Sequence, residues 1–189
     1  MNSNEINIAI VGATGAAGGT ALELLLERNH PTDKIVAMAS ERSAGKKIQY
    51  GDTELTVVHA TVDAFEGIDV ALFAAGGYVS RRLARKVVEK GVFVIDKGSI
   101  FRMDPTIPLV VPEVNADDIE WHPGIVSTPN CTSTPLVMVL DALRSLSPIT
   151  AVTVATYQSV TGTGVAANEE LLEQSRAALA GGNSVPQVY

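Results

Sequence analysis

The opening segment of the chain limits its possible folds more than any other feature. Residues 6–11 (INIAIV) form an apolar run that leads directly into GATGAAG, and residues 16–28 follow with leucines at helical spacing. The apolar run indicates a buried strand, and the glycines indicate a tight turn into a helix. Such a strand, turn and helix form the first unit of many α/β sheets.

Strand-like and helix-like segments continue to alternate along the chain. Further strands are predicted over residues 34–39, 55–59, 69–74, 92–96 and 124–127, with a helix over 79–90. This order favours an α/β fold with a Rossmann-type, doubly wound parallel sheet covered by helices. The basic residues of helix 79–90 are interpreted as a solvated face; they are Arg81, Arg82, Arg85 and Lys86.

The pattern changes after Ser127. A helix is predicted over residues 136–146, a β-branched strand over 150–157, and a second helix over 166–179. We therefore predict a nucleotide-binding domain over residues 1–127 and the start of an α+β catalytic and dimerisation domain over 128–189. Because one strand and two helices cannot bury both faces of a sheet, we expect the sequence to be truncated.

The composition disfavours several classes of partner. The 189 residues are 46% hydrophobic and 19% charged, which suits a folded core, and a net charge of -7 disfavours nucleic acid. No apolar stretch approaches the roughly 18 residues of a membrane span, and the N-terminus lacks the basic start of a signal peptide. We expect a cytoplasmic protein with no membrane partner and no metal site.

Three glycines separate the first strand from the first helix. Gly12, Gly15 and Gly18 have the spacing GxxGxxG. Glycine at these positions lets the backbone approach a pyrophosphate, whose charge meets the free N–H groups of the helix N-terminus. A tight turn without a ligand is the alternative, but the position directly after an apolar strand favours nucleotide binding.

The loop after the second strand bears on which dinucleotide binds. It reads SERSAGKK, in which Glu41 is a candidate acid for the ribose 2′-hydroxyl of NAD. Ser40, Arg42 and Ser43 instead offer a cation and two hydroxyls, a set suited to a 2′-phosphate. We therefore favour NADP as the cofactor.

The single cysteine, Cys131, lies in the segment TPNCTSTP. Asn130, the hydroxyl residues around it and Pro135 predict a helix start, where the helix dipole stabilises a thiolate. A small packing residue is the alternative, but the polar neighbours favour a nucleophile. A thiolate beside a nicotinamide holds an acyl group as a thioester ready for hydride transfer.

Together, these motifs resemble those of the aspartate-semialdehyde dehydrogenase family. The matching segments are, in chain order, GATGAAG, SERSAGK, FRMDPTIPLVVPEVN, PNCTST and TYQSVTGTG. The chain resembles the N-terminal half, or slightly more, of such an enzyme. The resemblance implies NADPH-dependent reduction of L-aspartyl 4-phosphate to L-aspartate 4-semialdehyde through a cysteine thioester. It also implies a homodimer that serves lysine (diaminopimelate), threonine and methionine biosynthesis.

The resemblance also assigns roles, position by position. Cys131 is the expected nucleophile, and the expected substrate contacts are Arg102 for the phosphate, Asn130 beside the sulfur and Gln158 for the acyl group. The expected cofactor contacts are Gly12, Thr14, Gly15, Ala16, Ser40, Arg42, Ser43, Gly76 and Gly77. From the residues alone, an ion pair of Arg102 with Asp96 or Asp104 is an equal alternative, and Gln158 is more typical of a turn.

Two features leave the expected enzyme incomplete. Lys97 follows the strand-end Asp96 where the family usually has a small polar residue, and it either adds to phosphate binding or is solvated. His30, His59 and His122 match no motif and are interpreted as structural or solvent-facing, so we find no general base. The family's catalytic His and its substrate-carboxylate Arg would follow Tyr189, so we expect these 189 residues alone to be inactive.

Two other functions remain open at this point. N-acetyl-γ-glutamyl-phosphate reductase shares the phosphate loop, the cysteine nucleophile and the acyl-phosphate chemistry. A catalytically silent, nucleotide-binding paralogue is the second alternative, and it predicts an unreactive Cys131.

Overall fold

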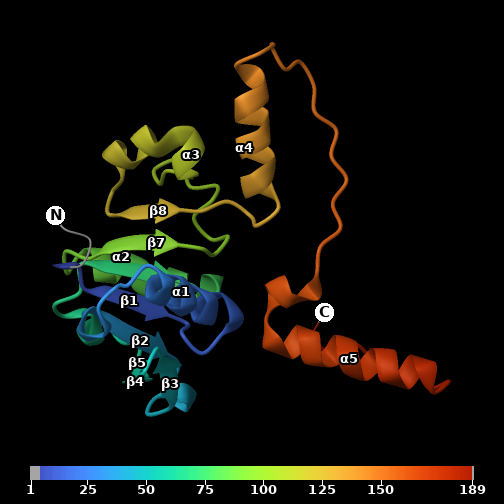
Figure 1. The fold of residues 1–189 in the computed structure, drawn as a ribbon, viewed down its shortest axis with the longest axis horizontal. Coiled ribbons are helices and arrows are strands. Elements are labelled where there is room, and N and C mark those ends of the chain that lie inside the picture. Colours follow the sequence, from blue (N-terminus) through green and yellow to red (C-terminus); the bar gives the residue numbers. More distant parts are fainter. Residues whose placement is uncertain (1–4, 189) are drawn as a thin grey trace. The chain divides into compact units, whose positions relative to one another are not determined.

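A computed structural model describes residues 5–188 of the protein, and the chain divides into two compact units, residues 1–150 and 151–189 (Figure 1). The first unit contains the whole of the main sheet, and the second contains one long helix. The predicted domain boundary at Ser127 falls inside the first unit, at the end of its last strand, and stays a prediction.

A six-stranded parallel sheet forms the centre of the first unit, in the order β5-β2-β1-β6-β7-β8. From β1 the chain builds outwards to β5 and then returns to β6 on the other side of β1. The predicted doubly wound parallel sheet is therefore confirmed. The strands are β1 (Ile8–Val11), β2 (Ile35–Ala39), β5 (Val58–His59), β6 (Val70–Phe73), β7 (Phe93–Asp96) and β8 (Ile125–Ser127).

Helices α1 (Ala16–Glu27) and α2 (Gly77–Val88) cover opposite faces of this sheet (Figure 1). Side chains alternate between faces along each strand. Ile10 packs in the cluster that holds Leu22 of α1, whereas its neighbour Val11 packs in the cluster that holds Leu83 of α2. Each fully buried side chain of this size contributes about 1.5–3 kcal/mol, so both clusters hold the strand ends in place.

A small antiparallel hairpin extends the face that α1 covers. Its strands are β3 (Lys47–Tyr50) and β4 (Thr53–Thr56). Tyr50 is buried in the cluster that holds Leu22, and its hydroxyl donates to the carbonyl of His30 at 3.0 Å. Strand β3 is not predicted from the sequence, and the predicted strand over residues 55–59 is two strands, β4 and β5, in the structure.

The remaining elements of the first unit follow β7 and β8. Helix α3 (Pro112–Asn115) precedes β8, and α4 (Ser133–Arg144) follows it and contacts α3. The predicted helix over 136–146 is confirmed, with a start three residues earlier and an end two residues earlier. Short 3-10 helices in the chain are η2 (Thr32–Lys34), η3 (Glu41–Ser43), η4 (Val62–Phe65), η5 (Ala116–Trp121) and η6 (Val160–Thr163).

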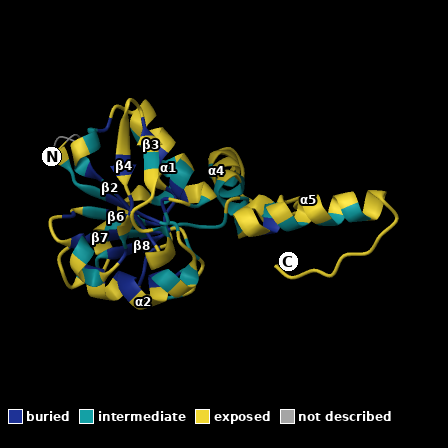
Figure 2. Ribbon diagram, turned by 90° about the horizontal axis from the view of Figure 1, so that it is seen from below, coloured by how far each residue is buried: buried dark blue, intermediate teal, exposed yellow. Residues whose placement is uncertain are grey.

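The second unit consists of an extended segment, η6 and helix α5 (Val165–Leu179). Helix α5 confirms the predicted helix, and it buries only Ala167 (Figure 2). The predicted strand over residues 150–157 is wrong, because that segment has no regular secondary structure and residues 150–159 are exposed. β-Branched residues favour a strand only where a neighbouring strand supplies hydrogen bonds, and none pairs with this segment within residues 5–188.

No helix within residues 5–188 is long and apolar enough to cross a membrane.

Candidate functional site

The carboxyl ends of the parallel strands collect nearly all the residues singled out from the sequence. Residues 12–16 form the loop after β1 and the first residue of α1, and residues 40–43 follow β2. Gly76 ends the loop after β6, and Gly77 begins α2. Arg102 follows β7, and Cys131 follows β8. In parallel α/β sheets, ligands bind at this edge, in the crevice where the strand order reverses. Here the reversal lies between β1 and β6.

Two of the three glycines after β1, Gly12 and Gly18, leave no room for a side chain. Gly12 has φ +92°, and a Cβ atom there would lie 2.8 Å from the carbonyl oxygen of Ala74. A Cβ atom on Gly18 would lie 2.1 Å from the carbonyl oxygen of Gly12. Gly15, the residue before α1, donates its N–H to the same Gly12 oxygen at 2.9 Å. The loop therefore brings bare backbone and the start of α1 together, as a pyrophosphate requires.

The loop after β6 faces this glycine loop across the strand reversal. A Cβ atom placed on Gly12 would lie 2.9 Å from the backbone nitrogen of Ala75, the residue before Gly76 and Gly77. Gly76 has φ +83° and stands immediately before α2, whose first residue is Gly77. Two glycine-containing loops, each opening a helix, therefore meet at the crevice between β1 and β6.

The predicted 2′-phosphate residues form a short helical turn at the end of β2. Ser40 precedes η3, and Ser43 returns its N–H to the Ser40 carbonyl at 2.9 Å. Ser40, Glu41 and Arg42 are exposed, and Ser43 is half-buried. The structure thus presents the cation, the hydroxyls and the alternative acid Glu41 on one turn, two strands away from the β6 loop.

Arg102 links the loops that follow β7 and β8. Its Nε donates to the Thr128 carbonyl at 3.0 Å, and its Nη2 donates to the Lys97 carbonyl at 3.1 Å. The alternative pairing with Asp104 is wrong, since Asp104 pairs with Arg85 at 2.8 Å. These two bonds use two of the five N–H donors of the guanidinium, which leaves Nη1 for an anion.

Cys131 is exposed just before helix α4. The side-chain oxygen of Asn130 accepts the N–H of Thr132 at 3.0 Å and the Thr132 hydroxyl at 2.7 Å. The Asn130 carbonyl also accepts the N–H groups of Ser133 and Thr134. Asn130 therefore organises the start of the helix, as the capping residues predicted. Its Oδ1 lies 3.8 Å from the sulfur.

Asp96 is a buried polar residue that the sequence analysis did not assign to the site. It ends β7 and is 0% exposed, and its Oδ1 accepts the Ser80 hydroxyl at 2.5 Å. Burial raises the pKa of this carboxyl, while the Ser80 hydroxyl, the Gly98 N–H and the charge of Arg102 oppose that rise. The available signal was an acid ending the apolar strand VFVID, with a glycine two residues later.

The three histidines lie away from Cys131. His30 is buried, with Nε2 3.1 Å from the Ile6 carbonyl, and His122 precedes β8 and accepts the Gly124 N–H. His59 ends β5, which lies five strand spacings, or about 24 Å, from β8. These positions agree with the interpretation of the three histidines as structural or solvent-facing. Gln158 belongs to the second unit, where it is exposed.

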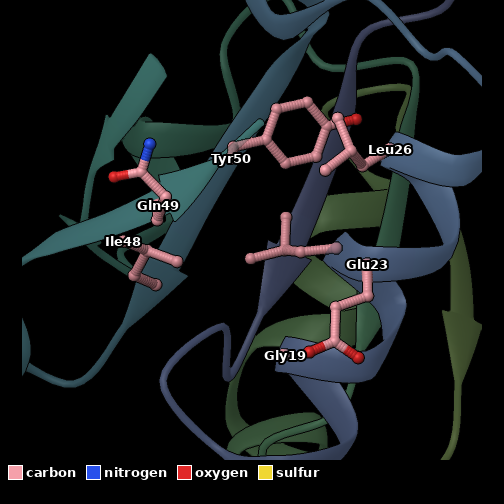
Figure 3. Close-up of a pocket in the computed structure, with 7 residues that line it drawn as sticks. Gly19, Glu23, Leu26, Ile48, Gln49 and Tyr50 are labelled. Atoms are coloured by element: carbon pink, nitrogen blue, oxygen red, sulfur yellow. The ribbon is translucent and has the colours of Figure 1, made fainter. Parts of the chain in front are cut away.

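A shallow cavity lies between α1 and the β3–β4 hairpin, away from the predicted site residues (Figure 3). Its volume is about 110 Å³, and Leu26, Ile48 and Tyr50 form much of its apolar wall. None of the predicted cofactor or substrate contacts lines it.

Residues 7–122 match the family model described as semialdehyde dehydrogenase, NAD binding domain. The chain belongs to the semialdehyde dehydrogenase family. Within this family, it is 45% identical to the aspartate-semialdehyde dehydrogenase of Bacillus subtilis over 174 residues, which are 92% of this chain and 50% of that protein. It is 46% identical to the Aquifex aeolicus enzyme of the same name over 173 residues, 90% of this chain and 51% of that protein.

Solved semialdehyde dehydrogenase structures agree with the fold. Aspartate semialdehyde dehydrogenase II of Vibrio cholerae, complexed with ASA, superposes with a TM-score of 0.91 at 39% identity, covering 97% of this chain and 55% of that one. The Candida albicans enzyme with NADP gives a TM-score of 0.61 at 26% identity, covering 75% of this chain and 47% of that one. The chain thus spans about half the length of the relatives it matches.

Proposed function

We propose that this chain carries the dinucleotide site and the nucleophile of an aspartate-semialdehyde dehydrogenase, which reduces L-aspartyl 4-phosphate with NADPH. The observation that carries the proposal is the common sheet edge: the cysteine loop, the Arg102 loop and the glycine loops all follow strands of one parallel sheet. The relatives of that name, at 45% and 46% identity, support the substrate. A homodimer and a cytoplasmic location remain predictions.

The chemistry assigned to this chain begins at Cys131. Its thiolate attacks the acyl carbon, the S–C bond forms, and the C–O bond to phosphate breaks, so that phosphate leaves with the electron pair. Asn130 holds the first turn of α4 next to the sulfur through its hydrogen bond to the N–H of Thr132. The Nη1 side of Arg102 binds the departing phosphate. A bound nicotinamide would supply the hydride that reduces the thioester.

Arg42 decides between the two dinucleotides in this proposal. Ser40, Arg42 and Ser43 share the η3 turn at the end of β2, where the 2′ position of the adenosine ribose lies in a Rossmann sheet. A guanidinium and two hydroxyls suit a phosphate dianion better than a hydroxyl. The NADP-bound Candida albicans relative also favours NADP.

Equilibrium titrations test this cofactor preference without requiring turnover. Arg42→Ala is expected to raise the Kd for NADPH about tenfold to a hundredfold, since a charged hydrogen bond contributes about 1.5–3 kcal/mol, and to change the Kd for NADH less than about threefold. Arg81→Ala removes an exposed arginine from α2 and serves as the control. Equal effects of Arg42→Ala on both dinucleotides would contradict the preference.

Mass spectrometry of the acyl-enzyme tests the substrate. Mixing the chain with L-aspartyl 4-phosphate is expected to add an aspartyl group to Cys131, and the adduct should be absent from Cys131→Ser. N-acetyl-γ-glutamyl phosphate, offered in parallel, represents the alternative reductase. An adduct from the glutamyl compound alone would reverse the substrate assignment, and a Cys131 that neither acyl phosphate nor iodoacetamide modifies would favour the silent paralogue.

A further inference from the structure

A buried hydrogen bond joins the sheet to the first turn of α2. The Ser80 hydroxyl donates to Asp96 Oδ1 at 2.5 Å, and both residues are at most 1% exposed. The other carboxylate oxygen, Oδ2, makes no hydrogen bond of normal geometry within residues 5–188, although the Gly98 N–H lies close enough to the carboxylate to lower its pKa. Burying a carboxylate with one oxygen unpaired destabilises a fold, so this residue is a poor choice for packing alone.

The alternation of side chains along β7 directs Asp96 towards α2. Val94, two residues earlier, packs in the cluster that holds Leu83 and Val87 of α2. Residues two apart on a strand share a face, so Asp96 also faces α2 and meets Ser80 there. Ser127, the register partner of Asp96 on β8, has a buried hydroxyl without a hydrogen-bond partner among the described residues.

The Ser80–Asp96 contact lies in the first turn of α2. Ser80 lies four residues after Gly76, whose carbonyl accepts the N–H of Val79 at 3.1 Å and that of Ser80 at 3.4 Å. The segment before Gly76 packs directly on Gly12, because a Cβ atom placed on Gly12 would lie only 2.9 Å from the backbone nitrogen of Ala75. A shift of the first turn of α2 therefore moves one wall of the dinucleotide crevice.

Asp96 also touches the loops on its other side. A Cβ atom on Gly98 would lie 3.1 Å from Asp96 Oδ2, so the chain after β7 folds back over the carboxylate. The Asp96 carbonyl accepts the N–H of Thr128 at 2.9 Å, and Arg102 donates to the Thr128 carbonyl. One residue thus contacts the loop after β7, the loop after β8 and the first turn of α2.

We propose that Asp96 is a positioning residue for the dinucleotide site: through Ser80 it holds the first turn of α2, and with it Gly76 and Gly77, against Gly12. The inference rests on the proposed function only in that these loops bind a dinucleotide. It assigns Asp96 no contact with the cofactor.

NADPH titrations of the 189-residue chain and four variants test this proposal. Ser80→Ala is expected to raise the Kd about fivefold and Asp96→Ala about tenfold, on the scale of one buried hydrogen bond. The double variant should bind no more weakly than Asp96→Ala, because the two side chains act as one unit. Asp96→Asn keeps an acceptor for Ser80 and should stay within about twofold of the unmodified chain.

Ser127→Ala is the matched control. It removes a second buried serine hydroxyl on the same side of the sheet, but one that makes no hydrogen bond within residues 5–188. Its Kd for NADPH should not change. A Kd for Ser80→Ala equal to that of Ser127→Ala would overturn the proposal, as would an Asp96→Asn variant that binds as weakly as Asp96→Ala.

Amide hydrogen exchange separates this inference from the proposed function. Ser80→Ala should accelerate exchange in residues 74–80, and Ser127→Ala should not, whether or not NADPH is present. If the unmodified chain fails to bind NADPH while this exchange pattern appears, the proposed function is wrong, and Asp96 still positions the first turn of α2 and the loop before it. Unchanged exchange in Ser80→Ala overturns the positioning role. Should Asp96→Ala not fold, Ser80→Ala and Asp96→Asn still decide the result.

Discussion

Gly18→Ala is the substitution whose effect the structure constrains most tightly. The new Cβ atom would lie 2.1 Å from the Gly12 carbonyl oxygen and 2.7 Å from its carbon, whereas ordinary contact begins near 3.4 Å. Both neighbours are backbone atoms, so no side-chain rotation relieves the overlap. Helix α1 must move about 1.3 Å away from the glycine loop. Overpacking of this kind costs about 3 kcal/mol, and the higher helix propensity of alanine offsets about 1 kcal/mol.

The expected result is a net loss of about 2 kcal/mol of unfolding free energy, or about 4–8 °C in Tm for a chain of this size. Urea unfolding followed by the fluorescence of Trp121 and by far-UV circular dichroism measures the loss. The same displacement separates the start of α1 from the pyrophosphate position. The Kd for NADPH should therefore rise on the order of tenfold or more.

Gly19→Ala is a control within the same helix. A Cβ atom on Gly19 meets nothing within 4 Å. The alanine should therefore stabilise the protein by about 0.5–1 kcal/mol through helix propensity alone. If Gly18→Ala and Gly19→Ala prove equally stable and bind NADPH equally well, the close approach of α1 to the Gly12 carbonyl is wrong.

Three further substitutions give sharp expectations. Tyr50→Phe should lower the free energy of unfolding at pH 7 by about 1 kcal/mol, because it removes a buried hydrogen bond. Burial raises the pKa of Tyr50 above 10.0, so the unmodified chain should lose stability as the pH rises through the folded-state pKa of Tyr50, and the variant should lack that loss. Hydrogen bonds from Thr106, and then the charge and hydrogen bond of Arg85, lower the pKa of Asp104 below 3.8. The ionised carboxylate therefore stabilises the fold above pH 3.8, and this contribution is lost on acidification. As the pH is lowered below 4, the urea midpoint of Asp104→Asn should fall less steeply than that of the unmodified chain. Arg102→Lys should lower stability by about 1–2 kcal/mol in urea unfolding, since lysine cannot reach both carbonyls as the planar guanidinium does; an unchanged midpoint would contradict the bridging role.

The sequence alone predicted the sheet and the edge where the site lies. Apolar runs and glycine spacing are local signals, and the parallel order follows from the alternation of strands and helices. Once the strands are parallel, Gly12, Arg42, Arg102 and Cys131 must lie at one edge, because each follows the end of a strand. The reading of the Asn130 segment as a helix start also needed only local hydrogen-bonding chemistry.

Contacts between distant segments could not be predicted in this way. The sequence left Arg102 undecided between a phosphate and nearby carboxylates, and the structure directs it to two carbonyls because the loops after β7 and β8 lie side by side. The segment over residues 150–157 has strand-forming residues, but the structure gives it no partner strand among the described residues.

The sequence by itself determined which residues reach the carboxyl edge of the sheet, since strand direction and glycine turns are encoded locally. Only the tertiary structure decided how those loops are held. The Ser80–Asp96 hydrogen bond joins residues sixteen positions apart, and the Gly12 approach to Ala74 spans two strands. The hydrogen bond depends on the packing of α2 against one face of the sheet, and the Gly12 approach depends on the pairing of β1 with β6. Both are long-range properties that no local pattern contains.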